Sequence, residues 1–179
     1  MSQKKSDKSE TEGQKHILSV LVENKFGVLV RVSGLFSRRG YNIDSLSVAV
    51  TENPSISRMT IVVRADDQVL EQVKKQLNKL IDVIKVIDLN DEEHVERELA
   101  LIKVKTVKDT KPEILQIVDA FRAKVIDIAT DSFIIEVTGD DKKIEAIETL
   151  LRPFEIQEMV RTGRVGLSRG YKEGSRDRN

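Results

Sequence analysis

The sequence predicts an α+β protein made of two consecutive βαββαβ units. Apolar segments of strand length alternate with longer segments whose apolar positions follow the period of a helix. The order strand, helix, strand, strand, helix, strand occurs twice, first over residues 15–90 and again over residues 95–162. An acidic run at residues 90–93 separates the two passes, and we expect a domain boundary there.

The composition excludes several classes of function. The 179 residues suffice for two compact units, and Lys+Arg and Asp+Glu number 30 each, so the formal net charge is zero. This balance argues against a protein that binds nucleic acid or a membrane surface. The absence of cysteine removes disulfides, thiolate chemistry and Cys-ligated metal sites, and it is compatible with the cytoplasmic location that we expect. No apolar run approaches the ~20 residues needed to span a bilayer.

The two ends of the chain differ from the units between them. Residues 1–14 are polar and lack the apolar core of a signal peptide, so we expect a disordered leader. Residues 163–179 are expected to form a basic, solvated tail. The apolar residues 165–167 within it indicate that part of the tail docks on another surface, such as that of a partner protein.

The first unit contains the clearest helix signal. Its strands are predicted at residues 17–22, 43–50, 58–63 and 83–89. The first helix is predicted from an apolar stripe of Val28, Leu29, Val32, Leu35 and Phe36. Gly40 stands where a helix needs a left-handed C-terminal residue, and Asp66 or Asp67 is expected to cap the second helix. This order of elements is that of a ferredoxin-like unit.

The second unit repeats this pattern. Its strands are predicted at residues 99–107, 125–129, 133–137 and 156–161. Thr110 and Glu113 fit a capping box around Pro112, and Asp140 with Asp141 stands at the second helix as Asp66 with Asp67 does in the first unit. We therefore interpret the two units as an internal repeat.

The loop before the first helix carries the candidate ligand site. Gly27 opens the helix without a side chain, so a small anion such as a carboxylate can approach the N–H groups of the first turn. Asn24 and Asn42 bracket the helix, and each offers a donor and an acceptor. These features suggest a pocket for a small zwitterion. The alternative interpretation is that Asn24 is a helix cap and Gly27 a turn residue. Residues 108–111 in the second unit lack both residue types, so we expect no ligand there.

Several segments in one order resemble a known family. The sequence is similar to an ACT domain, and more narrowly to the regulatory (small) subunits of acetolactate synthase, also called acetohydroxyacid synthase. The resemblance covers nearly the whole chain after the first dozen or so residues. It is carried by residues 18–24, 27–29, 31–32, 34–43, 57–61, 71–80 and 166–170.

The resemblance implies a non-catalytic subunit with no catalytic residues of its own. Such a subunit binds and activates the acetolactate synthase catalytic (large) subunit and confers feedback inhibition by valine in branched-chain amino acid biosynthesis. The thiamine diphosphate, FAD and magnesium of that enzyme belong to the catalytic partner. The first unit would be the ACT domain and the second an ACT-like domain.

The resemblance also implies a homodimer through the ACT domain, with the effector bound between the two first units. Carried over by motif position, Asn24, Gly27 and Val28 line the pocket from one subunit, and Asn42 and Ile43 line it from the other. Leu21 or Ile43 would close on the aliphatic side chain of the effector.

Other functions find less support in the residues. An RNA-binding ferredoxin-like domain would show aromatic residues on its central strands, and residues 58–63 offer none. An acylphosphate hydrolase would need a positioned water as well as an anion loop. No nucleophile elbow, Walker A loop or dinucleotide fingerprint occurs, and His16 and His94 lie outside any metal-ligand spacing. A stand-alone ACT-domain amino-acid sensor that regulates another enzyme, or an ACT-type transcription factor, is the remaining alternative.

Overall fold

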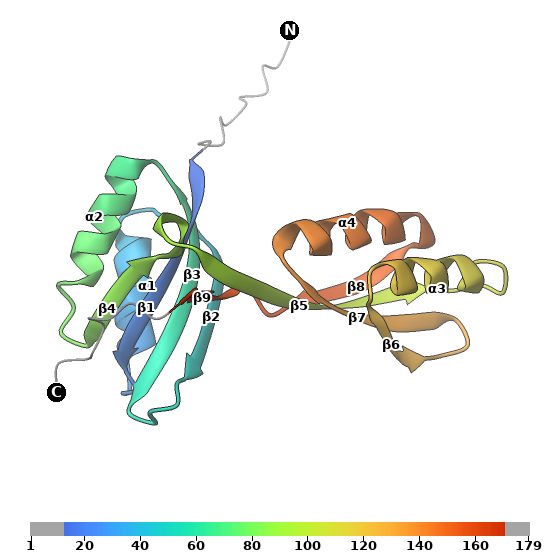
Figure 1. The fold of residues 1–179 in the computed structure, drawn as a ribbon, viewed down its shortest axis with the longest axis horizontal. Helices are drawn as coiled ribbons and strands as arrows, with labels where there is room; N and C mark the ends of the chain where they lie inside the picture. The colour runs from blue at the N-terminus through green and yellow to red at the C-terminus, as the bar shows by residue number, and fades with distance from the viewer. Residues whose placement is uncertain (1–12, 171–179) are drawn as a thin grey trace, which may run out of the picture.

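The computed structural model describes residues 13–170, which form two α+β units joined by extended chain (Figure 1). Each unit contains a four-stranded antiparallel sheet whose elements follow the order βαββαβ. This arrangement confirms the predicted fold class. The predictions for residues 1–12 and 171–179 lie outside the described residues.

The first unit is a sheet covered on one face by two helices. Its strands lie in the order β2-β3-β1-β4. The elements are β1 (Gln14–Glu23), α1 (Val28–Arg38), β2 (Ile43–Val50), β3 (Ile56–Ala65), α2 (Asp67–Leu77) and β4 (Val83–Asp88). Leu18, Val20 and Val22 alternate along β1 into the core between sheet and helices, where Val32 and Phe36 of α1 are also buried. In Figure 1 both helices cover the face turned away from the second unit.

Both helix ends predicted in the first unit are confirmed. Gly40 has φ +70°, and it follows the C-cap of α1. The Gly40 N–H donates to the Ser37 carbonyl and the Tyr41 N–H donates to the Phe36 carbonyl, both at 3.1 Å, which is the bonding pattern of a Schellman motif. At α2 the Asp66 carboxylate accepts from the Val69 N–H at 2.7 Å.

The second unit repeats the architecture with strand order β6-β7-β5-β8. Its elements are β5 (His94–Lys105), α3 (Lys111–Ala120), β6 (Lys124–Ile128), β7 (Ser132–Gly139), α4 (Asp141–Leu151) and β8 (Ile156–Arg161), with short 3₁₀ turns η1 (Leu89–Asp91) before β5 and η2 (Arg152–Phe154) after α4. Its own core is built around Ile102, Ile135, Ile144 and Ile147, all fully buried. Each unit therefore has an independent apolar interior.

The predicted capping box at the start of α3 is wrong. Thr110 does stand at the N-cap, but it makes no side-chain cap hydrogen bond. Its φ of −91° and ψ of −17° are already helical, whereas a capping side chain needs an extended backbone. The hydroxyl instead accepts from the Val107 N–H and donates to the Val107 carbonyl.

Strand β5 begins five residues before its predicted start, at His94 and not at residue 99, and there it pairs with a strand that was not predicted. Its first residues, 94–97, pair antiparallel with β9 (Val165–Ser168), and its later residues pair with β7. Gly166 of β9 packs on Leu89, which forms a small buried cluster with Ile17 and Val62 on the helix-free face of the first sheet. The apolar residues 165–167 thus dock on this chain itself.

We predict that Gly166→Val weakens this docking. A side chain at Gly166 would collide with the fully buried Leu89, and overpacking of this kind costs about 1–3 kcal/mol in the free energy of unfolding. Urea denaturation followed by circular dichroism measures the loss. Leu167→Val is the matched control because Leu167 is 60% exposed on the same strand, and its effect should stay within about 0.5 kcal/mol. Equal losses in the two variants would contradict the packing argument.

Candidate functional site

The first turn of α1 presents unused hydrogen-bond donors. Gly27 is the N-cap residue with φ +82°, a left-handed conformation that costs a glycine little, and no side chain caps the helix. The Val28 N–H makes a long bond of 3.4 Å to the Lys25 carbonyl. The N–H groups of Leu29 and Val30 have no partner among the described residues. With no acidic residue in the first turn, this end can receive an anion.

Arg31 lies beside the same helix end, and sequence reasoning missed it. One guanidinium nitrogen lies 3.2 Å from the position that a Cβ atom on Gly27 would occupy. The Arg31 Nε donates to Asp82 Oδ2 at 2.6 Å, and Asp82 is 7% exposed in the turn before β4. The four-residue spacing from Gly27 to Arg31 places both on one side of the helix, and that spacing was the available signal. The site therefore offers a cation as well as free N–H groups.

Asn24 ties the candidate loop to the end of the β2–β3 hairpin. Its backbone N–H donates to the Ser55 carbonyl at 2.7 Å, and its side-chain amide donates to the Pro54 carbonyl at 2.9 Å. The side chain does not cap α1, so the alternative interpretation of Asn24 as a helix cap is not supported. Its amide oxygen faces no donor within the described part of the chain and can accept from a ligand.

Asn42 and Ile43 lie at the other end of α1. An 11-residue helix is about 16 Å long, so one chain does not bring them to Gly27. The exposed Asn42 amide makes one long hydrogen bond, 3.4 Å to Asp44, and Ile43 packs partly on the first core. The turn after α1 is held by backbone bonds without the Asn42 side chain. A site containing all these residues requires two chains.

The side chains of Val28 and Leu21 do not face the space beside Gly27 at the start of α1. The Val28 side chain is buried in the core, so only its backbone faces the helix end. Leu21 is half-buried on β1 between the inward-facing Val20 and Val22, so alternation places it on the helix-free face of the sheet. Its predicted contact with an effector therefore lies on the opposite face from Ile43.

Two groups of exposed apolar side chains flank the candidate site. Phe26, Val30 and Ile81 are strongly exposed near the Arg31–Asp82 ion pair. Leu29 on α1 and Val48 and Val50 on the edge strand β2 are each 41–53% exposed. Large exposed apolar side chains, where they gather into a patch, are typical of an interaction site.

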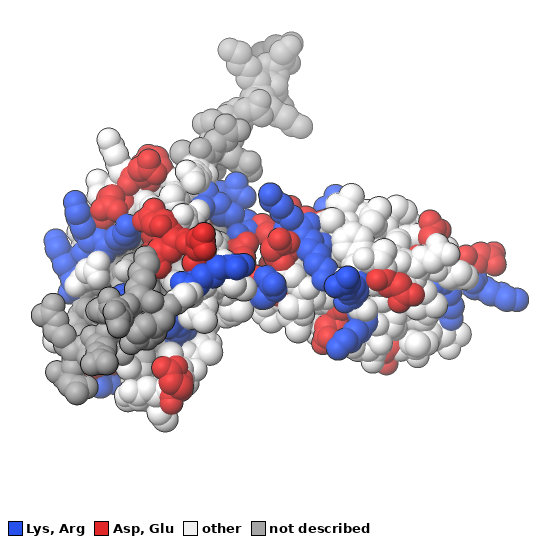
Figure 2. All heavy atoms as spheres, viewed as in Figure 1, with Lys and Arg blue, Asp and Glu red and all other residues white. Residues whose placement is uncertain are grey.

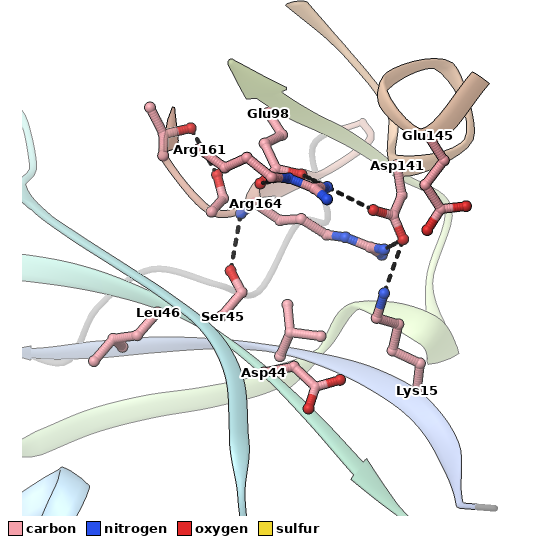
Figure 3. A pocket seen from close by; sticks show the side chains of 12 residues that line it. Lys15, Asp44, Ser45, Leu46, Glu98, Asp141, Glu145, Arg161 and Arg164 are labelled. Atoms are coloured by element: carbon pink, nitrogen blue, oxygen red, sulfur yellow. Dashed lines mark hydrogen bonds and ion pairs between the residues drawn. The ribbon is translucent and has the colours of Figure 1, made fainter. Parts of the chain in front are cut away.

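A second polar site lies at the junction of the two units. Its cavity of about 340 Å³ is lined by Lys15, Asp44, Ser45, Leu46 and Val62 from the first unit, and by Glu98, Asp141, Glu145, Arg161, Thr162, Gly163 and Arg164 from the remainder (Figure 3). Figure 2 shows basic and acidic side chains gathered together where the units meet.

Asp141, the first residue of α4, is the centre of this junction. One carboxylate oxygen accepts from Arg161 at 2.8 Å, and the other accepts from Lys15 at 2.8 Å and from Arg164. Arg161 also makes a two-pronged pair with the buried Glu98 at 2.9 and 2.5 Å. We call Lys15, Glu98, Asp141, Arg161 and Arg164 the junction cluster. Each charge of this cluster has a partner of opposite charge within it, and Arg164 also donates to Glu96 Oε2 at 3.3 Å.

The junction cluster changes the acidity of Asp141. Burial on its own would raise the pKa of this carboxyl group from its ordinary value of 3.8. Hydrogen bonds from Lys15 and Arg161, together with the charge of Arg164, outweigh burial and lower the pKa to about 2. The carboxylate is therefore ionised throughout the physiological range.

Neither a metal site nor a membrane-spanning helix is found in residues 13–170. There, no group of three or more His, Cys, Asp and Glu side chains lies close enough to hold a metal ion. None of the helices formed by these residues is long and apolar enough to cross a membrane.

Both units match family models of the same kind of protein. Residues 18–85 match the family model described as "AHAS small subunit-like ACT domain", and residues 97–170 match the model described as "Small subunit of acetolactate synthase". Gly27, Arg31 and Asn42 lie within the first match, and Asp141 lies within the second.

Individual relatives agree with these matches. The chain is 55% identical over 159 residues to the probable acetolactate synthase small subunit of Archaeoglobus fulgidus, covering 89% of this chain and 99% of that one. It is 54% identical over 155 residues to the acetolactate synthase small subunit of Mycolicibacterium smegmatis, covering 87% and 91%. The crystal structure of the acetolactate synthase small subunit from Thermotoga maritima superposes with a TM-score of 0.80 at 44% identity, covering 89% of this chain and 99% of that chain.

The pKa of Asp141 leads to a testable prediction. Because the folded-state pKa lies below 3.8, the ionised carboxylate stabilises the fold above about pH 4, and this contribution disappears as the pH falls through about 2. Asp141→Asn should lower the free energy of unfolding by about 1–2 kcal/mol near pH 7, after allowance for solvent screening. Denaturation at a series of pH values should show the difference shrinking below about pH 4 and vanishing only below about pH 2. A difference that does not change with pH would contradict the role of the charge.

Proposed function

Because this chain belongs to the family of acetolactate synthase small subunits, the non-catalytic regulatory components of that enzyme, we propose that it senses valine or a related branched-chain amino acid. In this proposal it binds and activates a large catalytic subunit and transmits feedback inhibition to it. The observation that carries the proposal is the uncapped start of α1 at Gly27, with Arg31 beside it.

The effector carboxylate would bind at the start of α1. The free N–H groups of Leu29 and Val30 and the guanidinium of Arg31 are oriented towards the space that Gly27 leaves open. Charge-assisted hydrogen bonds of this kind are about twice as strong as neutral ones. The free amide oxygen of Asn24 would accept from the effector ammonium group.

Two chains would complete the pocket. Strand β2 is an edge of the first sheet and carries the exposed Val48 and Val50, so a second copy can pair with it and cover them. In antiparallel pairing about a two-fold axis, the start of one β2 lies beside the end of the other. Asn24 is bonded to the hairpin that follows β2. The partner's Asn42 and Ile43 would therefore approach the Asn24–Gly27 loop.

The roles of the two units, the cofactors and the location in the cell are inferred from family membership. Residues 15–90 would bind effector and form the dimer, residues 95–162 would form the ACT-like domain, and residues 163–179, which include β9, would be the basic tail. Thiamine diphosphate, FAD and magnesium would reside in the catalytic partner, in the cytoplasm. A stand-alone amino-acid sensor that regulates another enzyme is less favoured. The reason is that residues 97–170, too, match a family model of the acetolactate synthase small subunit.

We predict that Gly27→Asp weakens effector binding. The new carboxylate would occupy the free N–H groups and Arg31 in place of the effector, so binding should weaken by at least ~1–3 kcal/mol in isothermal titration with valine. The left-handed φ of +82° adds a strain of about 1 kcal/mol, which the fold should tolerate at an exposed loop. Thr110→Asp is the matched control, because Thr110 is the N-cap of α3 in the second unit. If Gly27→Asp binds valine as the wild type does, the pocket is elsewhere.

Asn42→Ala should separate inhibition from activation. Asn42 would contact the effector across the dimer, whereas activation should use other surface, so the reconstituted enzyme should keep its stimulated rate and lose sensitivity to valine. The measurement is the rate of acetolactate formation against valine concentration. Parallel loss of both effects, with a lower melting temperature, would instead assign Asn42 a role in shaping the turn.

A further inference from the structure

The two units are joined by only two chain segments, which form a narrow ribbon. Strand β5 leaves the first unit paired with β9 along residues 94–97, and the same strand enters the second sheet beside β7 and β8. Between β8 and β9 the chain turns at Gly163, which has φ +77°. Figure 1 shows this two-stranded ribbon between the sheets. A short ribbon that turns at such a glycine has the form of a hinge.

Side-chain contacts across the hinge are few and specific. The Lys15 ammonium of β1 donates to Asp141 of α4 at 2.8 Å. The Ser45 hydroxyl of β2 accepts from the Arg164 N–H at 3.1 Å and lies against Gly163. Arg164 in turn donates to Asp141. Figure 3 shows these groups surrounding the junction cavity.

The hinge contacts adjoin the proposed effector site through β2. Ile43 begins this strand, Asn42 immediately precedes it, and Ser45 lies two residues after Ile43 in the same strand. Between Ile43 and Ser45 the pairing with β3 shifts register, so this segment departs from regular strand geometry. A ligand that moves Asn42 and Ile43 would therefore also move the contact between Ser45 and the hinge.

We propose that the junction cluster is a latch that sets the angle between the two units, and that effector binding is transmitted to the second unit by changing this latch. Asp141 is its positioning residue, because this carboxylate of the second unit bonds Arg161 of its own unit and also Lys15 and Arg164, which lie on the first unit's side of Gly163. This inference rests on the proposed function, in which the first unit binds the effector. With the latch open, the effector would still bind, but the second unit would no longer respond.

The internal repeat provides a matched control. Asp67 is the first residue of α2 as Asp141 is of α4, and it is exposed outside the junction. The test therefore compares Asp141→Asn with Asp67→Asn in the full chain. Asp141→Glu keeps the charge, and Lys15→Gln opens the latch without leaving a buried charge unpaired, which matters if Asp141→Asn folds poorly.

Two measurements decide the proposal. Small-angle X-ray scattering of the chain should show a wider distribution of interatomic distances for Asp141→Asn and Lys15→Gln, and the wild-type distribution for Asp67→Asn. In the reconstituted enzyme, the activity remaining at saturating valine should rise at least twofold for the two latch variants, while the chain's own valine affinity in titration stays within about twofold. Asp141→Glu should restore inhibition.

Two results would overturn the latch. One is full valine inhibition of the Asp141→Asn and Lys15→Gln enzymes, and the other is a scattering profile equal to that of the wild type in both. If the wild-type chain bound no branched-chain amino acid, the proposed function would fail instead. The scattering comparison would then still decide whether the junction cluster holds the units together.

Discussion

Strand β5 belongs to both units, and the positions of the two sheets depend on this continuity. Its first residues pair with β9 beside the first unit, and its later residues form the centre of the second sheet. Each sheet buries its own core, so neither unit needs the other to fold its interior. The junction is instead polar, with charges that bond across the hinge at Asp141. Polar interfaces between domains favour relative motion, as a regulatory subunit requires.

In the proposed mechanism, sensing and transmission lie at opposite ends of strand β2. The start of α1, with free N–H groups and Arg31, lies by the hairpin end of β2, whereas the latch lies by its beginning. An antiparallel dimer through β2 would bring the sensing end of one chain next to the latch end of its partner. An effector in that pocket would therefore contact the hinge of the neighbouring chain, and this arrangement would couple the two subunits.

Much of this fold follows from the sequence because local signals agree with the tertiary structure. The bounds of β2 and β8 match their predictions, and Gly40 and Asp66 end and begin helices as expected. Strand β9 was missed because four residues carry no periodic pattern, and its pairing depends on Leu89 from a distant segment. Arg31 and Asp82 escaped detection for the same reason, since 51 residues separate the two partners. The roles of Asn24 and Asn42 as effector ligands remain predictions.

The central claim is that the start of α1 binds the carboxylate of a branched-chain amino acid. Amide chemical shifts of the isotope-labelled chain, recorded by NMR during titration with valine and with valinol, test it most directly. The account predicts large shifts of the Leu29 and Val30 N–H signals with valine and none with valinol, which lacks the carboxylate. Unchanged Leu29 and Val30 signals at saturating valine, with shifts confined to residues elsewhere, would contradict it.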